Sequence, residues 1–127
     1  MIRKKTSKAM LSRRQTVIAD HVRHASNPLA RMKGLLGSKS LAAGHGLWLR
    51  PCSSIHTVGM SFPIDVLFLD KHRKIVRAAA KIKPMRICWA PLATRSVLEL
   101  PEGTIARYSI QAEEQVEFID VDGTEAH

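Results

Sequence analysis

Residues 52–70 read CSSIHTVGMSFPIDVLFLD and form the most apolar part of the chain. Within them, Ile64 to Leu69 is a short run of β-forming residues, with Pro63 before it and Asp70 after it. An apolar run of this length between turn-forming residues is typical of a strand packed on both faces, as in a barrel or a sandwich. The stretch therefore predicts a mainly β fold organised around one central strand.

One carboxylate lies inside this predicted strand. Asp65 has the parity of Leu67, so both side chains are expected on the same face. Burying an unpaired carboxylate is costly, so Asp65 needs hydrogen-bond partners. We expect these partners to be backbone N–H groups or the side chains of His56 and Thr57, which belong to a second predicted strand at residues 55–58.

Further short runs along the chain have strand-like patterns. Residues 75–82 should form a hairpin with the central strand, and their alternation predicts one apolar face made of Val76, Ala78, Ala80 and Ile82. The other predicted strands cover residues 15–22, 47–49, 95–100 and 116–121, with short helices at residues 27–37 and 104–109. Short strands at regular spacing predict a small antiparallel β-barrel, half-barrel or sandwich with one or two short helices.

Length and composition indicate one folded domain. The chain has 127 residues and is 45% hydrophobic, which suits a single core. We expect a disordered basic arm at residues 1–14, one β-barrel-like domain at residues 15–121 and a polar tail at residues 122–127.

The charge of the chain is unevenly distributed. The formal net charge is +9. Residues 1–97 carry 19 Lys or Arg against three acidic residues, a net +16, whereas residues 98–127 carry one Arg against eight acidic residues, a net −7. This asymmetry predicts either internal charge pairing or a basic face that is open to polyanions.

Cysteine usage and hydropathy bear on the location of the protein. Cys52 and Cys88 are the two cysteines, which is too few for a disulfide framework. No apolar run is long enough to span a membrane, and no apolar segment follows the basic N-terminal residues as it would in a secretory signal. We therefore expect a cytoplasmic protein without a membrane span, in which the two thiols are unbridged.

Several motifs occur in a fixed order along the chain. They are Arg31-Met32-Lys33-Gly34-Leu35-Leu36-Gly37, Gly46-Leu47-Trp48-Leu49, the stretch from Pro51 to Asp70, Pro84-Met85-Arg86 and Val97-Leu98-Glu99-Leu100-Pro101-Glu102-Gly103. This order resembles domain-of-unknown-function family 192, small bacterial and archaeal proteins, over residues 16–118. The most specific pattern is His56-Thr57-Val58-Gly59-Met60 followed by Pro63-Ile64-Asp65. The resemblance implies a compact β-barrel-like domain with small helices, and it carries no established reaction.

A binding module is the first of three function classes that the residues leave open. It would be non-catalytic and would hold a small ligand, or serve as an accessory module, with a pocket near the His56–Asp65 corner. Its predicted ligand-binding residues are His56, Thr57, Met60, Asp65, Trp89 and Glu99. Trp89 lies in a predicted loop at residues 83–94, where we expect it in the core rather than as a lid.

An enzyme is the less favoured class. Cys52 and His56 could supply a thiol nucleophile and its base, or two ligands of a soft metal site, but four residues of extended chain separate them by about 13 Å. Asp65 and Glu99 could form a carboxylate pair for acid–base chemistry. No catalytic constellation is complete, so we expect no catalytic residue, no metal and no cofactor.

A weak polyanion binder is the remaining class. Basic residues gather in and after the predicted hairpin, and the arm at residues 1–14 could extend them. The predicted contacts are Lys71, Arg73, Lys74, Arg77 and Lys81. Such contacts gain affinity by counterion release and carry no base readout, so binding to nucleic acid would be salt-sensitive and nonspecific.

Overall fold

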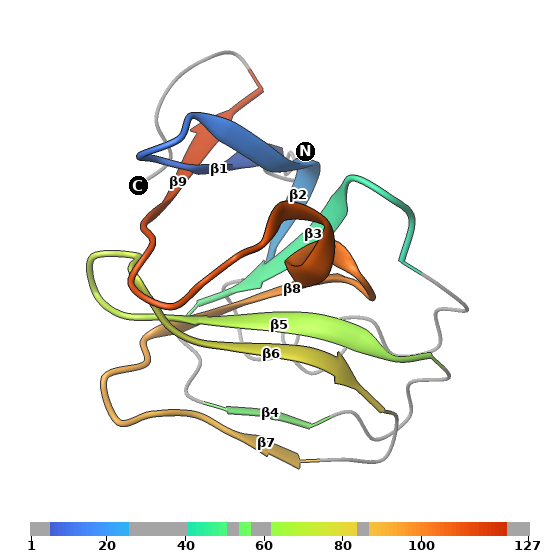
Figure 1. Cartoon of the computed structure of the whole chain (residues 1–127), viewed down its shortest axis with the longest axis vertical. Coiled ribbons are helices and arrows are strands. Elements are labelled where there is room, and N and C mark those ends of the chain that lie inside the picture. Colours follow the sequence, from blue (N-terminus) through green and yellow to red (C-terminus); the bar gives the residue numbers. More distant parts are fainter. Residues whose placement is uncertain (1–5, 26–40, 51–53, 57–61, 84–86, 122–127) are drawn as a thin grey trace, which may run out of the picture.

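The computed structural model describes residues 6–25, 41–50, 54–56, 62–83 and 87–121. Seven strands form one mixed sheet that curves into a half-barrel, in the order β6-β5-β8-β3-β2-β1-β9 (Figure 1). A separate two-stranded sheet pairs β4 with β7. The elements are β1 Thr6–Leu11, β2 Thr16–Ala25, β3 His45–Leu49, β4 Ser54–His56, β5 Ile64–Leu69, β6 Ile75–Ile82, β7 Ile87–Trp89, β8 Ser96–Pro101, α2 Thr104–Tyr108 and β9 Val116–Asp120. The prediction of a mainly β half-barrel with a short helix is confirmed.

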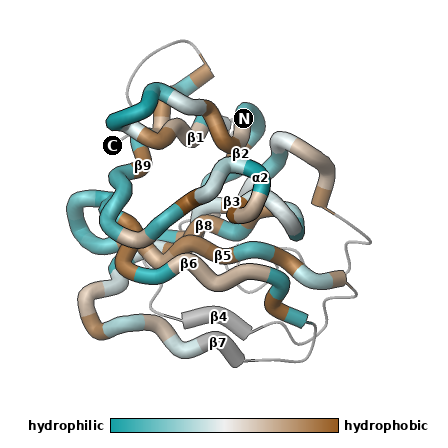
Figure 2. The backbone as a smooth tube through the Cα atoms, viewed as in Figure 1, coloured by the Kyte–Doolittle hydropathy of each residue, from teal (hydrophilic) through white to brown (hydrophobic). Residues whose placement is uncertain are grey.

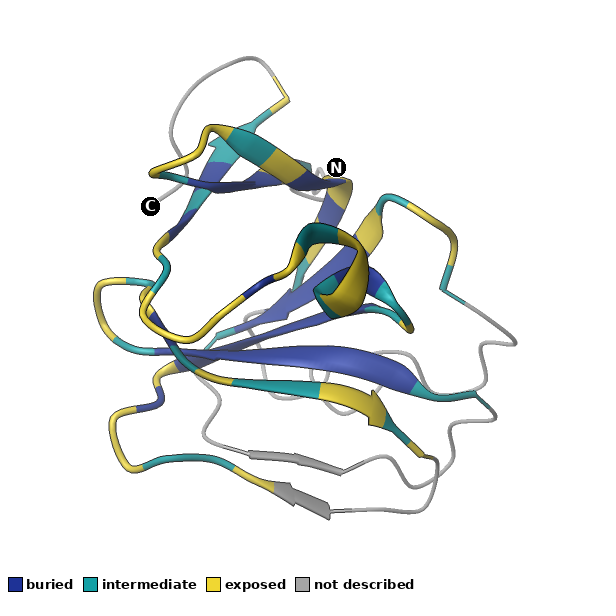
Figure 3. Cartoon of the chain, viewed as in Figure 1, coloured by how far each residue is buried: buried dark blue, intermediate teal, exposed yellow. Residues whose placement is uncertain are grey.

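The predicted central strand is β5, which pairs antiparallel with both β6 and β8. All of its residues are buried, and Figure 3 shows the buried colour along its length. Because side chains alternate between the faces of a strand, Leu67 enters one hydrophobic cluster while Val66 and Phe68 enter another. Burial on both faces explains the continuous apolar run in the sequence. The turn after β5, at residues 70–74, is polar (Figure 2).

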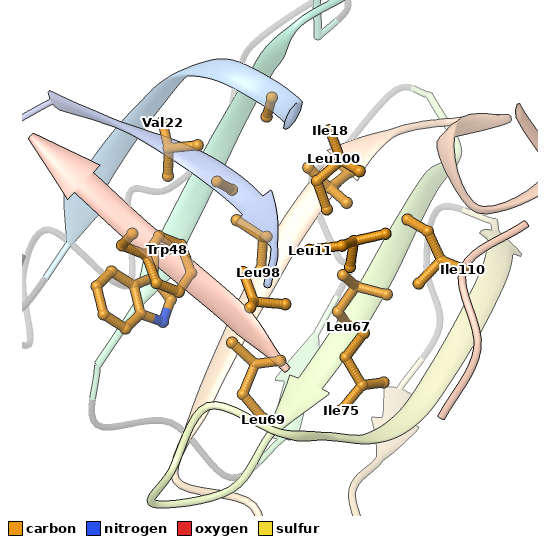
Figure 4. Close-up of a cluster of buried hydrophobic side chains, with 14 residues drawn as sticks. Leu11, Ile18, Val22, Trp48, Leu67, Leu69, Ile75, Leu98, Leu100 and Ile110 are labelled. Atoms are coloured by element: carbon orange, nitrogen blue, oxygen red, sulfur yellow. The ribbon is translucent and has the colours of Figure 1, made fainter. Parts of the chain in front are cut away.

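The larger cluster joins residues from both ends of the chain (Figure 4). Its members are Ala9, Leu11, Ile18, Ala19, Val22, Trp48, Leu67, Leu69, Ile75, Leu98, Leu100, Ile110, Val116 and Phe118. The ring of Trp48 stacks on that of Phe118, with centroids 3.5 Å apart and planes 4° apart. Full burial of each large apolar side chain contributes about 1.5–3 kcal/mol to folding.

The smaller cluster lies on the opposite face of the sheet. Its buried members are Ala25, Leu47, Leu49, Ile64, Val66, Phe68 and Val97. Partly buried apolar side chains, among them Phe62 and Ala79, pack against it. Both faces of β5 and β8 are therefore covered, so these two strands form the centre of the domain.

The predicted alternation along β6 is wrong. Val76 and Ala78 were expected on one face, but Val76 packs against the smaller cluster and Ala78 against the larger. The pairing of β6 with β5 shifts register twice, once near each end of β5. A bulge adds a residue to one strand and changes the face to which the following side chains point.

Residues 1–14 contain a strand where the sequence predicted a disordered basic arm. β1 lies between β2 and β9 and pairs antiparallel with both. Ala9, Met10 and Leu11 are buried, whereas Lys8 is exposed. Lys8 therefore lies at an exposed position of the strand and Arg13 and Arg14 in the exposed turn after it, and the short apolar run beside them supplies the core contacts.

Two further elements differ from prediction. β2 and β3 pair in parallel, although an all-antiparallel sheet was expected. Parallel neighbours need a long crossover connection, and residues 26–44 separate these two strands. In addition, β7 forms inside the segment 83–94 that was predicted to be loop. The helix predicted at residues 27–37 and the tail at 122–127 lie outside the described residues.

Candidate functional site

Asp65 joins three elements through its buried carboxylate. Oδ1 accepts a hydrogen bond from the backbone N–H of Lys81 at 2.9 Å, and Oδ2 accepts one from the N–H of Ile105 at 2.8 Å. Lys81 has a φ of 55° at the bulge of β6, and Ile105 lies in the first turn of α2. The prediction that Asp65 contacts backbone N–H groups is confirmed. Both oxygens serve the fold, which makes Asp65 a poor ligand contact.

The other half of the predicted corner falls mostly outside the described residues. Thr57 and Met60 lie there, as does Cys52, and the structure describes the backbone of His56 and Cys88 but not their side chains. His56 belongs to β4, whose register partner for it is Ile87 of β7. A contact between His56 and Asp65 therefore stays a prediction.

Glu99 has a buried carboxyl oxygen without a hydrogen-bond partner among the residues that the structure describes. It lies on β8 between Leu47 of β3 and Val66 of β5, both members of the smaller cluster. The residue is only 7% exposed, and its Oε2 is buried without a hydrogen-bond partner among the residues that the structure describes. Burial in these apolar surroundings raises the pKa of Glu99 from 4.5 to about 7.

Asp65 and Glu99 do not form a carboxylate pair. The register partner of Asp65 is Leu100, a member of the larger cluster, whereas the partner of Glu99 is Val66, a member of the smaller one. Neighbouring positions along a strand point to opposite faces. The structure therefore excludes the carboxylate pair that the sequence left possible, because the sheet separates the two carboxyl groups.

Trp89 is exposed instead of buried in the core. The residue is 72% exposed, which corrects the expectation of ordinary core packing. Its backbone carbonyl accepts a hydrogen bond from Nη1 of Arg77. Arg77 is the register partner of Phe68, a member of the smaller cluster. β7 therefore lies on the side of the sheet that carries Glu99.

The five predicted polyanion contacts have different surroundings. Nζ of Lys74 lies 3.7 Å from Oε2 of Glu113, so part of the basic hairpin meets the acidic C-terminal segment as the alternative predicted. Outside the hairpin, Arg14 also forms an ion pair with the acidic C-terminal segment, with its Nε 2.8 Å from Oε1 of Glu114. Arg77 reaches toward β7, and Lys81 lies at the bulge.

Lys71 and Arg73 line an open groove of about 450 Å³ at one end of the sheet. The groove lies at the end of β3 and the start of β8, next to the turn between β5 and β6. Its lining residues are Trp48, Arg50, Asp70, Lys71, Arg73, Arg95 and Ser96. Arg50 and Arg95 carry no signal in the sequence, because only the pairing of β3 with β8 brings them to the same end of the sheet.

In the part of the chain that the structure describes, no group of three or more His, Cys, Asp or Glu side chains is arranged to hold a metal ion. No helix in that part is long and apolar enough to cross a membrane.

Comparison with known proteins identifies relatives of unestablished function. The model of the family described as "Uncharacterized ACR, COG1430", domain-of-unknown-function family 192, matches residues 9–118. No curated protein matches the chain. The chain is similar to a crystal structure described as a "putative transcription regulator" from Sinorhizobium meliloti 1021, at 20% identity and a TM-score of 0.80, over 93% of this chain and 97% of that one. It is also similar to a protein of unknown function from Novosphingobium aromaticivorans DSM 12444, at 22% identity and a TM-score of 0.76, over 88% and 83% of the two chains. At these identities the likeness shows a shared fold.

Proposed function

Because the chain belongs to domain-of-unknown-function family 192, whose proteins have no established activity, we propose a function from its own geometry: a non-catalytic module that binds a small polar molecule at Glu99. The observation that supports this is the buried Oε2 of Glu99, which has no partner in the described residues. Nearly all buried polar atoms in proteins are hydrogen-bonded, so an exception needs an explanation.

The surroundings of Glu99 suit a ligand site of this kind. Small-molecule sites are mostly apolar and hold a few polar groups that fix the orientation of the ligand. Leu47 and Val66 are apolar register partners of Glu99 on the two neighbouring strands. A pKa near 7 lets Glu99 donate a hydrogen bond as the neutral acid or accept one as the carboxylate. Of the predicted residues, Trp89 lies on a strand of the same side, while His56, Thr57 and Met60 remain proposed members.

Native mass spectrometry of protein purified gently from its host tests this proposal. We expect a small-molecule adduct on the wild-type protein, and we expect Glu99→Gln to lose it because the amide cannot reproduce the carboxyl group. Glu102→Gln, which replaces an exposed carboxyl group by an amide, is the matched control and should keep the adduct. An adduct retained equally by all three proteins would place the ligand elsewhere. No adduct, together with no thermal stabilisation by a panel of small amines, alcohols and carboxylic acids, would refute the proposal.

An enzyme built on Cys52, His56 and Asp65 is less favoured by the same geometry. Asp65 already accepts two backbone hydrogen bonds in the interior. Using it as a base would require breaking them, which leaves buried N–H groups unsatisfied.

Weak polyanion binding is a second candidate function. Arg77 and Lys81 are exposed and take part in no ion pair among the described residues. We expect a random RNA oligomer to bind weakly in a fluorescence titration at low salt and to dissociate at moderate salt. The double variant Arg77→Gln/Lys81→Gln should bind more weakly still. If the wild-type protein fails to bind even at low salt, this function is excluded.

A further inference from the structure

The groove beside Trp48 has an excess of positive charge. Four of its lining residues are cationic, and one, Asp70, is acidic. Oδ1 of Asp70 accepts hydrogen bonds from the backbone N–H groups of His72 at 2.8 Å and Lys74 at 2.9 Å, so this carboxylate holds the turn together. Within the described part of the chain, Lys71, Arg73 and Arg95 form no ion pair. The groove therefore holds cationic groups that its own carboxylate does not neutralise.

Two guanidinium groups converge on one indole ring in this groove. Cζ of Arg50 lies 4.0 Å from the centroid of Trp48, and Cζ of Arg73 lies 5.3 Å from it. Burial, followed by the nearby Arg73, lowers the pKa of Arg50. Holding like charges close together is unfavourable, and an anion between them would attract both and offset their repulsion.

A chain of hydrogen bonds across the strands holds Arg50 in place. Nη2 of Arg50 lies 3.5 Å from Nδ1 of His24, and Nε2 of His24 lies 2.8 Å from Oγ of Ser7. The Ser7 hydroxyl donates to Oδ1 of Asp120 at 3.1 Å. Arg has no acceptor, so Nδ1 must accept from it and Nε2 must carry the proton that goes to Ser7. The groove thus has a pre-positioned guanidinium, and pre-positioning lowers the cost of binding.

Ser96 adds a neutral hydrogen-bonding group to the groove. The residue is 4% exposed and lines the groove. The aromatic surface is closed, because Phe118 and Arg50 both lie against the Trp48 ring. A ligand here can therefore be recognised by charge and hydrogen bonds but not by stacking a nucleobase on an open ring.

We propose that this groove binds the phosphate groups of a compact polyanion, a pyrophosphate or a phosphate ester. Arg side chains suit phosphate because the planar guanidinium offers two parallel donors, and the Lys71 ammonium and Ser96 hydroxyl add single donors. The site lies on the face of Trp48, opposite to Glu99, and stands independently of the function proposed there.

Isothermal titration calorimetry with sodium pyrophosphate, in a phosphate-free buffer at low salt, tests this site. We expect saturable binding to the wild-type protein that weakens as salt is raised. Arg73→Gln should weaken binding about tenfold or more, as expected for the loss of a charge-assisted hydrogen bond. Arg95→Gln is a second variant that keeps the test open if Arg73→Gln does not fold.

Arg107→Gln is the matched control for Arg73→Gln. Each substitution replaces one guanidinium by an amide and removes one charge, but Arg107 lies in the last turn of α2, is exposed, and does not line the groove. Arg107→Gln should bind pyrophosphate as the wild-type protein does. Wild-type protein that does not bind pyrophosphate, or equal weakening by Arg73→Gln and Arg107→Gln, overturns the proposal.

A competition experiment separates a free phosphate ligand from a nucleic-acid backbone. Pyrophosphate that displaces a random RNA oligomer supports a phosphate site in the groove. The opposite outcome has two parts: pyrophosphate gives no heat, and RNA binds but is not displaced by it. Together they overturn the groove proposal in favour of a diffuse basic surface.

Discussion

Asp65→Ala is expected to lower the free energy of unfolding by a few kcal/mol. The substitution leaves the N–H groups of Lys81 and Ile105 without their acceptor in the interior, and each unsatisfied group costs about 1–3 kcal/mol. It also frees the bulge of β6 and the first turn of α2 from β5 at the same time. Urea denaturation followed by circular dichroism measures the loss. Asp65→Asn, which retains one acceptor oxygen, should lose less.

Asp70→Ala is the matched control for this experiment. Asp70 also accepts two backbone N–H bonds, from His72 and Lys74, but it does so in an exposed turn where water can replace it. Asp70→Ala should therefore lower the free energy of unfolding by less than Asp65→Ala does. If the two variants lose the same stability, the buried position of Asp65 has no special importance for the fold.

Glu99→Gln is expected to stabilise the protein at neutral and alkaline pH. Burial raises the pKa of Glu99 from 4.5 to about 7 in the folded state, so the fold favours the neutral acid. Stability from this group is fully present below pH 4.5 and is lost as the pH rises through the folded pKa. The loss approaches about 3 kcal/mol above that pKa. The amide stays neutral throughout and avoids it.

Urea midpoints measured from pH 4.5 to pH 8 check the Glu99 prediction. The wild-type curve should fall relative to that of Glu99→Gln over this window, and the two proteins should be closest at the acidic end. Glu102→Gln, which removes an exposed carboxylate, should follow the wild-type curve. A difference between wild type and Glu99→Gln that does not change with pH would contradict an ionisable, buried Glu99.

The amino-acid sequence predicts the central strands well because their burial leaves a local pattern. β5 needs apolar residues on both faces, and this requirement appears directly as a continuous run. β1 was not predicted, because Lys8 and the basic turn after it make the segment polar on average and hide its short buried apolar run. The error along β6 has another cause, since a bulge is set by pairing with β5 and is not visible in β6 alone.

The candidate sites depend on the register in which the strands pair, and the amino-acid sequence does not show this register directly. Asp65 and Glu99 are both carboxylates in apolar surroundings, and only the pairing of β5 with β8 shows that they face opposite sides. In the same way, Arg50 and Arg95 meet because β3 pairs with β8. The sequence shows which residue types are available for both sites, but it does not show which residues become their neighbours across the sheet.

The pairing of β1 with β9 has a consequence for how the chain folds. Ser7 is the register partner of Asp120, so two strands from opposite ends of the sequence share a ladder, and Phe118 must arrive before the ring of Trp48 is covered. Closing so long a loop carries a large entropic cost, and sheets dominated by distant contacts fold slowly. During synthesis, β1 would leave the ribosome first and wait for β9 with one edge unpaired. Nascent protein should therefore spend time with an open edge strand, the stage at which chaperones and aggregation compete for a chain.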